Sequence, residues 1–134
     1  MIILGIETSC DETSAAILDN NKVISNIVRT QSIHTSFGGV VPSLASKDHE
    51  KSILSIVKAS IRKSNISISD IDLIAVTYGP GLLGSLIVGL NFAKGLSVGL
   101  GIPLVGVSHL KGHLFSSLLN NKSFIYPSIS LIVS

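Results

Sequence analysis

The sequence predicts an α/β layer fold, in which one mixed sheet carries helices on both faces. Three observations support this fold class. The chain opens with three short apolar segments separated by polar turns, which is typical of an antiparallel meander. Apolar residues then recur at helical spacing and alternate with further short apolar runs. Finally, a chain of 134 residues with 46% hydrophobic residues can bury one core, so we expect one domain or part of a larger one.

Three strands are predicted first, over residues 2–6, 14–18 and 23–29. The Asp19-Asn20-Asn21-Lys22 turn joins the last two, because Asn and Asp tolerate left-handed backbone. After the Gly38-Gly39 break, apolar spacing of three, four and eight residues predicts a helix over residues 42–63, with Pro42 in its first turn.

The second half of the chain alternates between strands and helices. The pattern predicts strands over residues 73–77, 103–107 and 128–133, and helices over 83–100 and 109–119. The run over 73–93 has no charge and is long enough to cross a bilayer. Gly79-Pro80-Gly81 interrupts that run near its middle, so we expect no membrane span.

Composition and charge exclude several kinds of protein. Only 13% of the residues are charged, where an average globular domain has about 25%, and this excludes a disordered chain. The net charge of +2 is too small to indicate nucleic acid by itself. The single cysteine, Cys10, excludes an internal disulfide, and the N-terminus lacks the pattern of a signal peptide. We therefore expect a cytoplasmic protein.

Two loops could bind a ligand. Glu7 to Thr13 holds three acids between two predicted strands, and Asp11 is the candidate catalytic residue there, although an ordinary hairpin would fit as well. Gly79-Pro80-Gly81 lies between a strand and a helix, where free N–H groups favour an anion. Its glycines could equally serve close packing, and the segment matches neither a Walker A nor a dinucleotide motif.

His109 and His113 form the strongest candidate site. Their i, i+4 spacing on a helix projects both imidazoles from one face, as in transition-metal sites. Two ligands are too few for a complete site, so two surface or capping histidines remain an alternative interpretation. Lys111 is expected on the opposite side of the helix. His34 and His49 are expected to be a surface-loop residue and a helix-face residue, without a ligand role.

Four blocks together resemble one family. They are Gly5-Ile6-Glu7-Thr8-Ser9-Cys10-Asp11-Glu12-Thr13, Gly38-Gly39-Val40-Val41-Pro42, Gly79-Pro80-Gly81-Leu82 and His109-Leu110-Lys111-Gly112-His113. In this order and spacing they are similar to the N-terminal part of the universal tRNA threonylcarbamoyladenosine transferases, formerly described as O-sialoglycoprotein endopeptidases. The resemblance implies an actin-like ATPase or sugar-kinase type domain over residues 1–127, the first of two such domains. Residues 128–134 would begin the second domain.

The resemblance also implies a reaction. The family transfers the threonylcarbamoyl group from threonylcarbamoyl-adenylate to the adenosine 3′ of the anticodon in tRNAs that read ANN codons. His109 and His113 match the family's ligands for one divalent metal ion, iron in the first place and zinc as an alternative. The third ligand is an aspartate that this chain lacks, so we expect the chain to be inactive alone. Asp11 matches the catalytic position near the reacting amine, and the substrate-binding strand matches Ile132, Val133 and Ser134.

Partners and departures follow from the same resemblance. Besides tRNA and threonylcarbamoyl-adenylate, a paralogous dimerisation partner and an accessory ATPase are expected. Lys111, Ser43 and Lys47 stand where the family usually has Glu, Glu and Arg; the first change leaves the metal ligands intact. A non-catalytic scaffold paralogous to the family is the alternative function, although we would not expect it to carry the histidine pair. A metallopeptidase is disfavoured because His109-Leu110-Lys111-Gly112-His113 lacks the glutamate of H-E-x-x-H.

Overall fold

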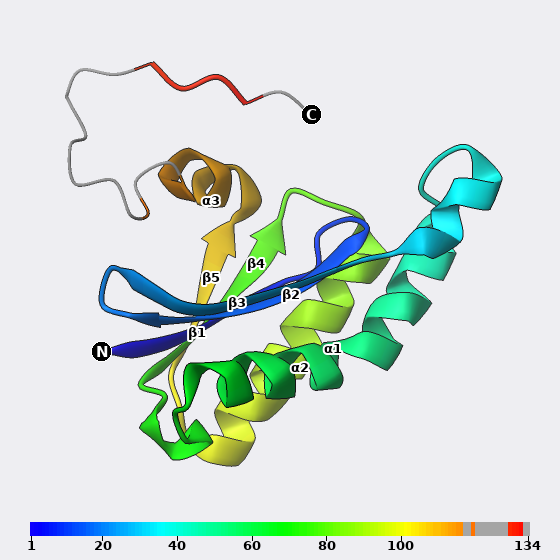
Figure 1. Ribbon diagram of the computed structural model, residues 1–134. Coiled ribbons are helices and arrows are strands. Elements are labelled where there is room, and N and C mark those ends of the chain that lie inside the picture. The colour runs from blue at the N-terminus through cyan, green and yellow to red at the C-terminus, as the bar shows by residue number, and fades with distance from the viewer. Residues whose placement is uncertain (117–118, 120–128, 133–134) are drawn as a thin grey trace.

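The computed structural model describes residues 1–116, 119 and 129–132, and it begins with the expected meander. Strands β1 (Ile2–Glu7), β2 (Glu12–Asp19) and β3 (Lys22–Thr30) pair antiparallel in succession (Figure 1). Asn20 takes the left-handed conformation in the β2–β3 turn, with φ of 51°. The turn chemistry read from the sequence therefore sets this hairpin.

Two further strands extend the sheet on the other side of β1. β4 (Leu73–Gly79) pairs parallel with β1, and β5 (Leu104–Ser108) pairs parallel with β4, which gives the order β3-β2-β1-β4-β5. The sheet is mixed, as expected. Because β1, β4 and β5 run in the same direction, the segments that follow them meet at one edge of the sheet.

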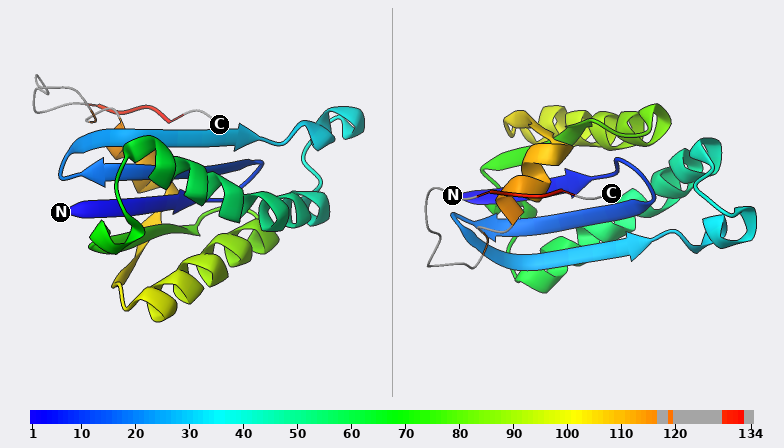
Figure 2. Two further views of the ribbon diagram at one scale, coloured as in Figure 1. Left: turned by 60° about the horizontal axis from the view of Figure 1, so that its bottom comes forward. Right: turned by 90° about the horizontal axis from the view of Figure 1, so that it is seen from above.

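The two long helices pack on the same face of this sheet. α1 (Pro42–Ser64) lies against β2 and β3, α2 (Leu83–Leu100) lies against β4, and the two helices contact each other (Figure 2). Strand alternation turns one set of side chains toward them. The core that results is formed by Leu4, Ile6, Ala15, Ile17, Ile53, Ile56, Val57, Ile71, Ile74, Val76 and Ala93.

The expectation of helices on both faces is wrong for the long helices. Helix α1 connects β3 to β4, and α2 connects β4 to β5; both connections move along the sheet toward β5. Because crossovers between parallel strands are right-handed, two crossovers in the same direction place their helices on the same face. Among the helices of the described residues, the short α3 (His109–Ser116), which follows β5 directly, lies on the opposite side, beyond the ends of β4 and β5 (Figure 1). Two 3-10 helices, η1 (Ser32–Phe37) and η2 (Ile68–Asp70), complete the described elements.

The sequence located most elements to within two residues, with one error near the end. Ile129–Ile132 has no strand geometry, so the strand expected over 128–133 is not formed by the residues that the structure describes. A β-strand needs a neighbour for its backbone hydrogen bonds, and this segment is paired with none of the five described strands. Residues 120–128 and 133–134 lie outside the described residues, and so does the expected domain boundary after residue 127.

Within the described chain, α2 is long and apolar enough to cross a membrane by length and composition alone. It has a packing role here. Ser85, Leu86, Gly89 and Ala93 are buried on its inner side, where the helix meets α1 and β4. The structure thus gives this helix a place in the α/β layer.

Candidate functional site

The candidate site lies where the segments after β1, β4 and β5 converge. A cavity of about 340 Å³ opens there between the β1–β2 loop and α3. A second cavity of about 350 Å³ adjoins it on the side of the Gly79-Pro80-Gly81 loop and shares Ser9, Cys10, His109 and His113. The first cavity is lined by Glu7, Ser9, Cys10, Asp11, Glu12, Thr77, Val107, Ser108, His109, Gly112 and His113.

The two histidines of α3 converge on one point. His109 begins the helix and His113 follows one turn later, so their rings lie on the same face in an edge-to-face arrangement, 4.5 Å between centroids. Their Nε2 atoms are 3.0 Å apart. This is a hydrogen-bond distance, and it is close to the separation of roughly 3.0–3.4 Å expected for two nitrogens that bind one metal ion at about 2.1 Å, with right-angled or tetrahedral geometry. The donors fit zinc or iron, both of which accept neutral imidazole.

The β1–β2 loop orients His109. Its Nδ1 lies 3.1 Å from the Ser9 hydroxyl oxygen and 3.6 Å from Oε1 of Glu7. The same Glu7 oxygen accepts a hydrogen bond of 2.6 Å from the Ser9 backbone N–H. An Nδ1–H that donates toward these oxygens leaves the Nε2 lone pair of His109 directed at the point between the rings.

Hydrogen bonds to three successive carbonyls hold the backbone of this loop. The carbonyl of Ser9 accepts from Leu82 N at 2.7 Å, and the carbonyl of Asp11 accepts from Gln31 N at 3.0 Å. Between them, the carbonyl of Cys10 accepts from His49 Nε2 at 2.9 Å. In a trans peptide the N–H points opposite to the carbonyl. The N–H groups of Cys10, Asp11 and Glu12 are therefore directed away from the residues that hold the carbonyls.

Two glycines allow the loop to approach α2 this closely. A Cβ at Gly81 would lie 2.5 Å from the Ser9 carbonyl oxygen, and a Cβ at Gly89 would collide with the Thr8 hydroxyl. That hydroxyl donates to the carbonyl of Ser85, 2.8 Å away. The glycine-rich segment after β4 thus serves close packing, which was one of its two interpretations. It also contributes Pro80, Gly81 and Leu82 to the wall of the second cavity.

The site brings Asp11 and the histidine pair to one cavity, although they are almost a hundred residues apart in sequence. Asp11 is half-buried and lines the cavity with both imidazoles. Its neighbour Cys10 is largely exposed, but partial desolvation of its thiol, together with the hydrogen bond and charge of the Asp11 carboxylate, raises the pKa of Cys10 above its ordinary value. Ile132, an expected substrate-binding residue, lines the second cavity, whereas Val133 and Ser134 lie outside the described residues.

The surface position expected for His34 is wrong, and His49, which lies on a helix face as expected, is on the buried face of α1. His34 is 6% exposed and bonds to Gln31, while His49 is fully buried beneath the β1–β2 loop. Helical spacing could have revealed His49, which follows Ala45 by four residues and precedes Ile53 by four, both on the buried face of α1. His34 gave no such signal, because it lies in a 3-10 helix of six residues.

Comparisons with known proteins agree with this fold and extend it to a family. The fold resembles YeaZ from Pseudomonas aeruginosa with a TM-score of 0.68 over 87% of this chain and 48% of that one, at 19% identity. It also resembles Thermus thermophilus RuvC, solved with a Holliday junction substrate, with a TM-score of 0.52 over 96% of this chain and 84% of that one, at 12% identity. These likenesses concern the fold alone.

Fold and site together define an α/β domain with a histidine pair at the carboxyl edge of its parallel strands. The family profile of TsaD, tRNA N6-adenosine threonylcarbamoyltransferase, matches residues 22–134. Proteins of that name from Thermosipho africanus and Chlamydia felis are 54% and 47% identical over the whole of this chain. The chain belongs to this transferase family, which confirms the resemblance seen in the sequence.

Coverage is unequal between the chain and these relatives. All of the chain is matched, but it spans 41% of the Thermosipho africanus protein and 39% of the Chlamydia felis protein. The site described above is accordingly built from about two fifths of the length found in the relatives.

Proposed function

We propose that this chain supplies the metal-binding and catalytic-loop part of an enzyme that modifies tRNA. The reaction transfers the threonylcarbamoyl group from threonylcarbamoyl-adenylate to the adenosine 3′ of the anticodon in tRNAs that read ANN codons. The observation that carries the proposal is the convergence of Asp11, His109 and His113 on one cavity. The expected cytoplasmic location, paralogous dimerisation partner and accessory ATPase belong to the same proposal.

The histidine pair would hold a divalent ion, iron in the first place or zinc. When bound, such an ion supplies Lewis-acid polarisation of an acyl oxygen. Four residues of this chain contribute to that arrangement. His109 and His113 would bind the ion through their Nε2 atoms, which hydrogen-bond to each other in the metal-free chain, so the ion would replace the hydrogen that one of them carries. Ser9 and Glu7 keep the His109 ring in this orientation.

The β1–β2 loop would serve the adenylate and the amine. Its outward N–H groups can donate to phosphate oxygens, because the carbonyls of the same peptides are held on the other side. The N6 amine attacks the carbamoyl carbon, a carbon–nitrogen bond forms, and the bond between that carbon and the phosphate oxygen breaks. AMP leaves with the electron pair, and the Asp11 carboxylate takes the proton that the amine loses.

Metal titration tests the carrying observation directly. Calorimetry with zinc should detect weak binding by the wild-type chain, because water must complete the coordination of a site with two imidazoles. His109→Ala and His113→Ala should each abolish it. Lys111→Ala is the matched control, since Lys111 is exposed on the same helix and does not line either cavity. Equal binding by wild type and His113→Ala would refute the site, and would favour the non-catalytic scaffold.

Turnover tests the reaction itself. The chain incubated with threonylcarbamoyl-adenylate and an ANN-decoding tRNA should give no modified adenosine, because a two-histidine site lacks an anionic third ligand. Modification by the chain alone would contradict the expectation that further protein is needed.

A further inference from the structure

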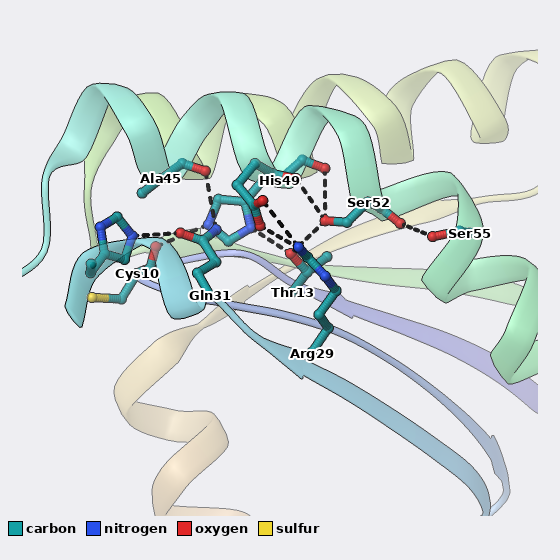
Figure 3. Close-up of polar contacts among 10 residues, drawn as sticks. Cys10, Thr13, Arg29, Gln31, Ala45, His49, Ser52 and Ser55 are labelled. Atoms are coloured by element: carbon teal, nitrogen blue, oxygen red, sulfur yellow. Dashed lines mark hydrogen bonds and ion pairs between the residues drawn. The ribbon is translucent and has the colours of Figure 1, made fainter. Parts of the chain in front are cut away.

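His49 is a buried polar side chain that the proposed reaction does not use. It lies on α1, is 0% exposed, and faces the β1–β2 loop (Figure 3). Its Nε2 is 2.9 Å from the Cys10 carbonyl oxygen, and its Nδ1 is 2.8 Å from the Thr13 hydroxyl oxygen. One ring therefore contacts the loop on both sides of Asp11.

The partners determine which nitrogen carries the hydrogen in the neutral ring. A carbonyl oxygen can only accept, so the Nε2 of His49 must carry a hydrogen and donate it to Cys10. In the neutral ring the Nδ1 then has a lone pair, which accepts the hydroxyl hydrogen of Thr13. Ser52 lies 3.1 Å from the same Thr13 hydroxyl and donates to the carbonyl of Asp48 at 2.8 Å. Each polar group around the ring thus has a partner.

α1 is itself tied to the end of the β2–β3 hairpin, so the ring has a rigid support. The Gln31 side chain donates to the carbonyl of Ala45 at 3.1 Å, and Arg29 forms a bidentate ion pair with Asp48 (Figure 3). Gln31 also donates its backbone N–H to the carbonyl of Asp11. His49 therefore joins a fixed helix to the loop at the two residues that enclose Asp11 and Glu12.

We propose that His49 is a positioning residue, which fixes the conformation of the Cys10–Thr13 loop and hence the place of the Asp11 carboxylate in the cavity. The role of Asp11 in catalysis rests on the proposed function, but the contact with the loop does not. Without the Nε2 donor, the Cys10 carbonyl keeps only the long contact of 3.4 Å with the Ser85 hydroxyl. The peptide between Cys10 and Asp11 then loses its short hydrogen bond, although the carbonyls on either side of it keep theirs.

Nuclear magnetic resonance of the chain tests this proposal in two ways. Long-range 15N spectra of the wild type should show the tautomer with hydrogen on Nε2 of His49. Backbone order parameters for residues 10–13 should be near 0.85 in the wild type and below about 0.6 in His49→Leu. His49→Gln places an amide N–H at the same number of bonds from Cα as Nε2, so it should restore the order.

Controls separate loop positioning from general stability. Ile56→Ala removes buried side chain from the same helix without touching the loop, and it should leave the order parameters of residues 10–13 unchanged. If His49→Leu does not fold, Thr13→Val and Thr13→Ser replace it; the first should loosen the loop and the second should not.

Three outcomes would overturn the proposal. The first is an ordered loop in both His49→Leu and Thr13→Val. The second is a loop as disordered in His49→Gln as in His49→Leu, and the third is a loop as disordered in Ile56→Ala as in His49→Leu. Failure of the proposed function gives a different result, because the wild type would then bind no zinc while the loop measurements stayed as expected.

Discussion

Ser9 does more at this site than its small side chain suggests. It is 2% exposed and lies between the end of β1 and α3. Its carbonyl accepts a hydrogen bond from the Leu82 N–H, its own N–H donates to the Glu7 carboxylate, and its hydroxyl contacts Nδ1 of His109. A hydroxyl or carboxylate beside Nδ1 selects which ring nitrogen keeps its lone pair. At the residue scale, metal binding thus depends on loop residues that are not ligands.

The first prediction concerns the His109 tautomer. Ser9→Ala and Glu7→Gln should each reduce the fraction of neutral His109 with hydrogen on Nδ1, because each removes or weakens an acceptor beside that atom. Long-range 15N spectra of the metal-free chain measure this fraction. Zinc affinity should fall about tenfold or more in Ser9→Ala, as for other partners of metal ligands. An unchanged tautomer in both variants would show that the loop does not orient the ring.

At the element scale, α2 and the segment that precedes it meet the β1–β2 loop at glycines that leave no room for a Cβ, Gly81 before the helix and Gly89 within it. Gly81→Ala would place its Cβ against the Ser9 carbonyl, so the Leu82–Ser9 hydrogen bond must lengthen or break. We expect a loss of about 1–3 kcal/mol in the free energy of unfolding, the usual cost of overpacking. Gly95→Ala, within α2, is the glycine-to-alanine control, because nothing lies within 4 Å of its added Cβ and alanine favours helix there. Urea denaturation that ranks the two variants equally would contradict this.

The ion pair between β3 and α1 predicts a pH dependence. The hydrogen bond from Arg29 holds the pKa of the Asp48 carboxyl below its ordinary value of 3.8. A lowered folded-state pKa stabilises the fold above the unfolded-state pKa, and this contribution disappears as pH falls through the folded-state pKa. Because the Arg29 side chain is 42% exposed, the effect should stay below about 1 kcal/mol.

Asp48→Asn tests this contribution. The difference in unfolding free energy between wild type and variant should be constant near neutral pH and should vanish as pH falls through the lowered pKa of the Asp48 carboxyl, where the wild-type carboxyl is protonated. A difference that persists in acid would assign the effect to packing instead of charge.

For the whole molecule, stability comes from one apolar layer between the sheet and the two long helices. Leu4 is 1% exposed in this layer, whereas Leu83 is 74% exposed at the start of α2. Leu4→Ala should cost about 2–5 kcal/mol, through lost burial and the cavity left behind. Leu83→Ala should change the free energy of unfolding by less than about 0.5 kcal/mol. Urea denaturation followed by circular dichroism measures both, and a small effect of Leu4→Ala would mean that the layer is not the main core.

Local chemistry allowed much of this fold to be predicted. The Asn-rich turn, Pro42 in the first turn of α1 and the period of the apolar residues located the helices and strands, since these signals act within a few residues. The four blocks identified the family, and the spacing of His109 and His113 placed two imidazoles on one face. These features depend on sequence neighbours, and sequence neighbours are visible without a structure.

Tertiary structure decided the rest, because the remaining contacts join residues that are far apart in the chain. Spacing alone could not bring Ser9 within 3.1 Å of His109, or bury His49 beneath Cys10, since both contacts depend on which strands are neighbours in the sheet. For the same reason, the prediction that helices cover both faces of the sheet was wrong for α1 and α2. The apolar pattern of an amphipathic helix shows that one side of it is buried, but not which face of the sheet it packs against.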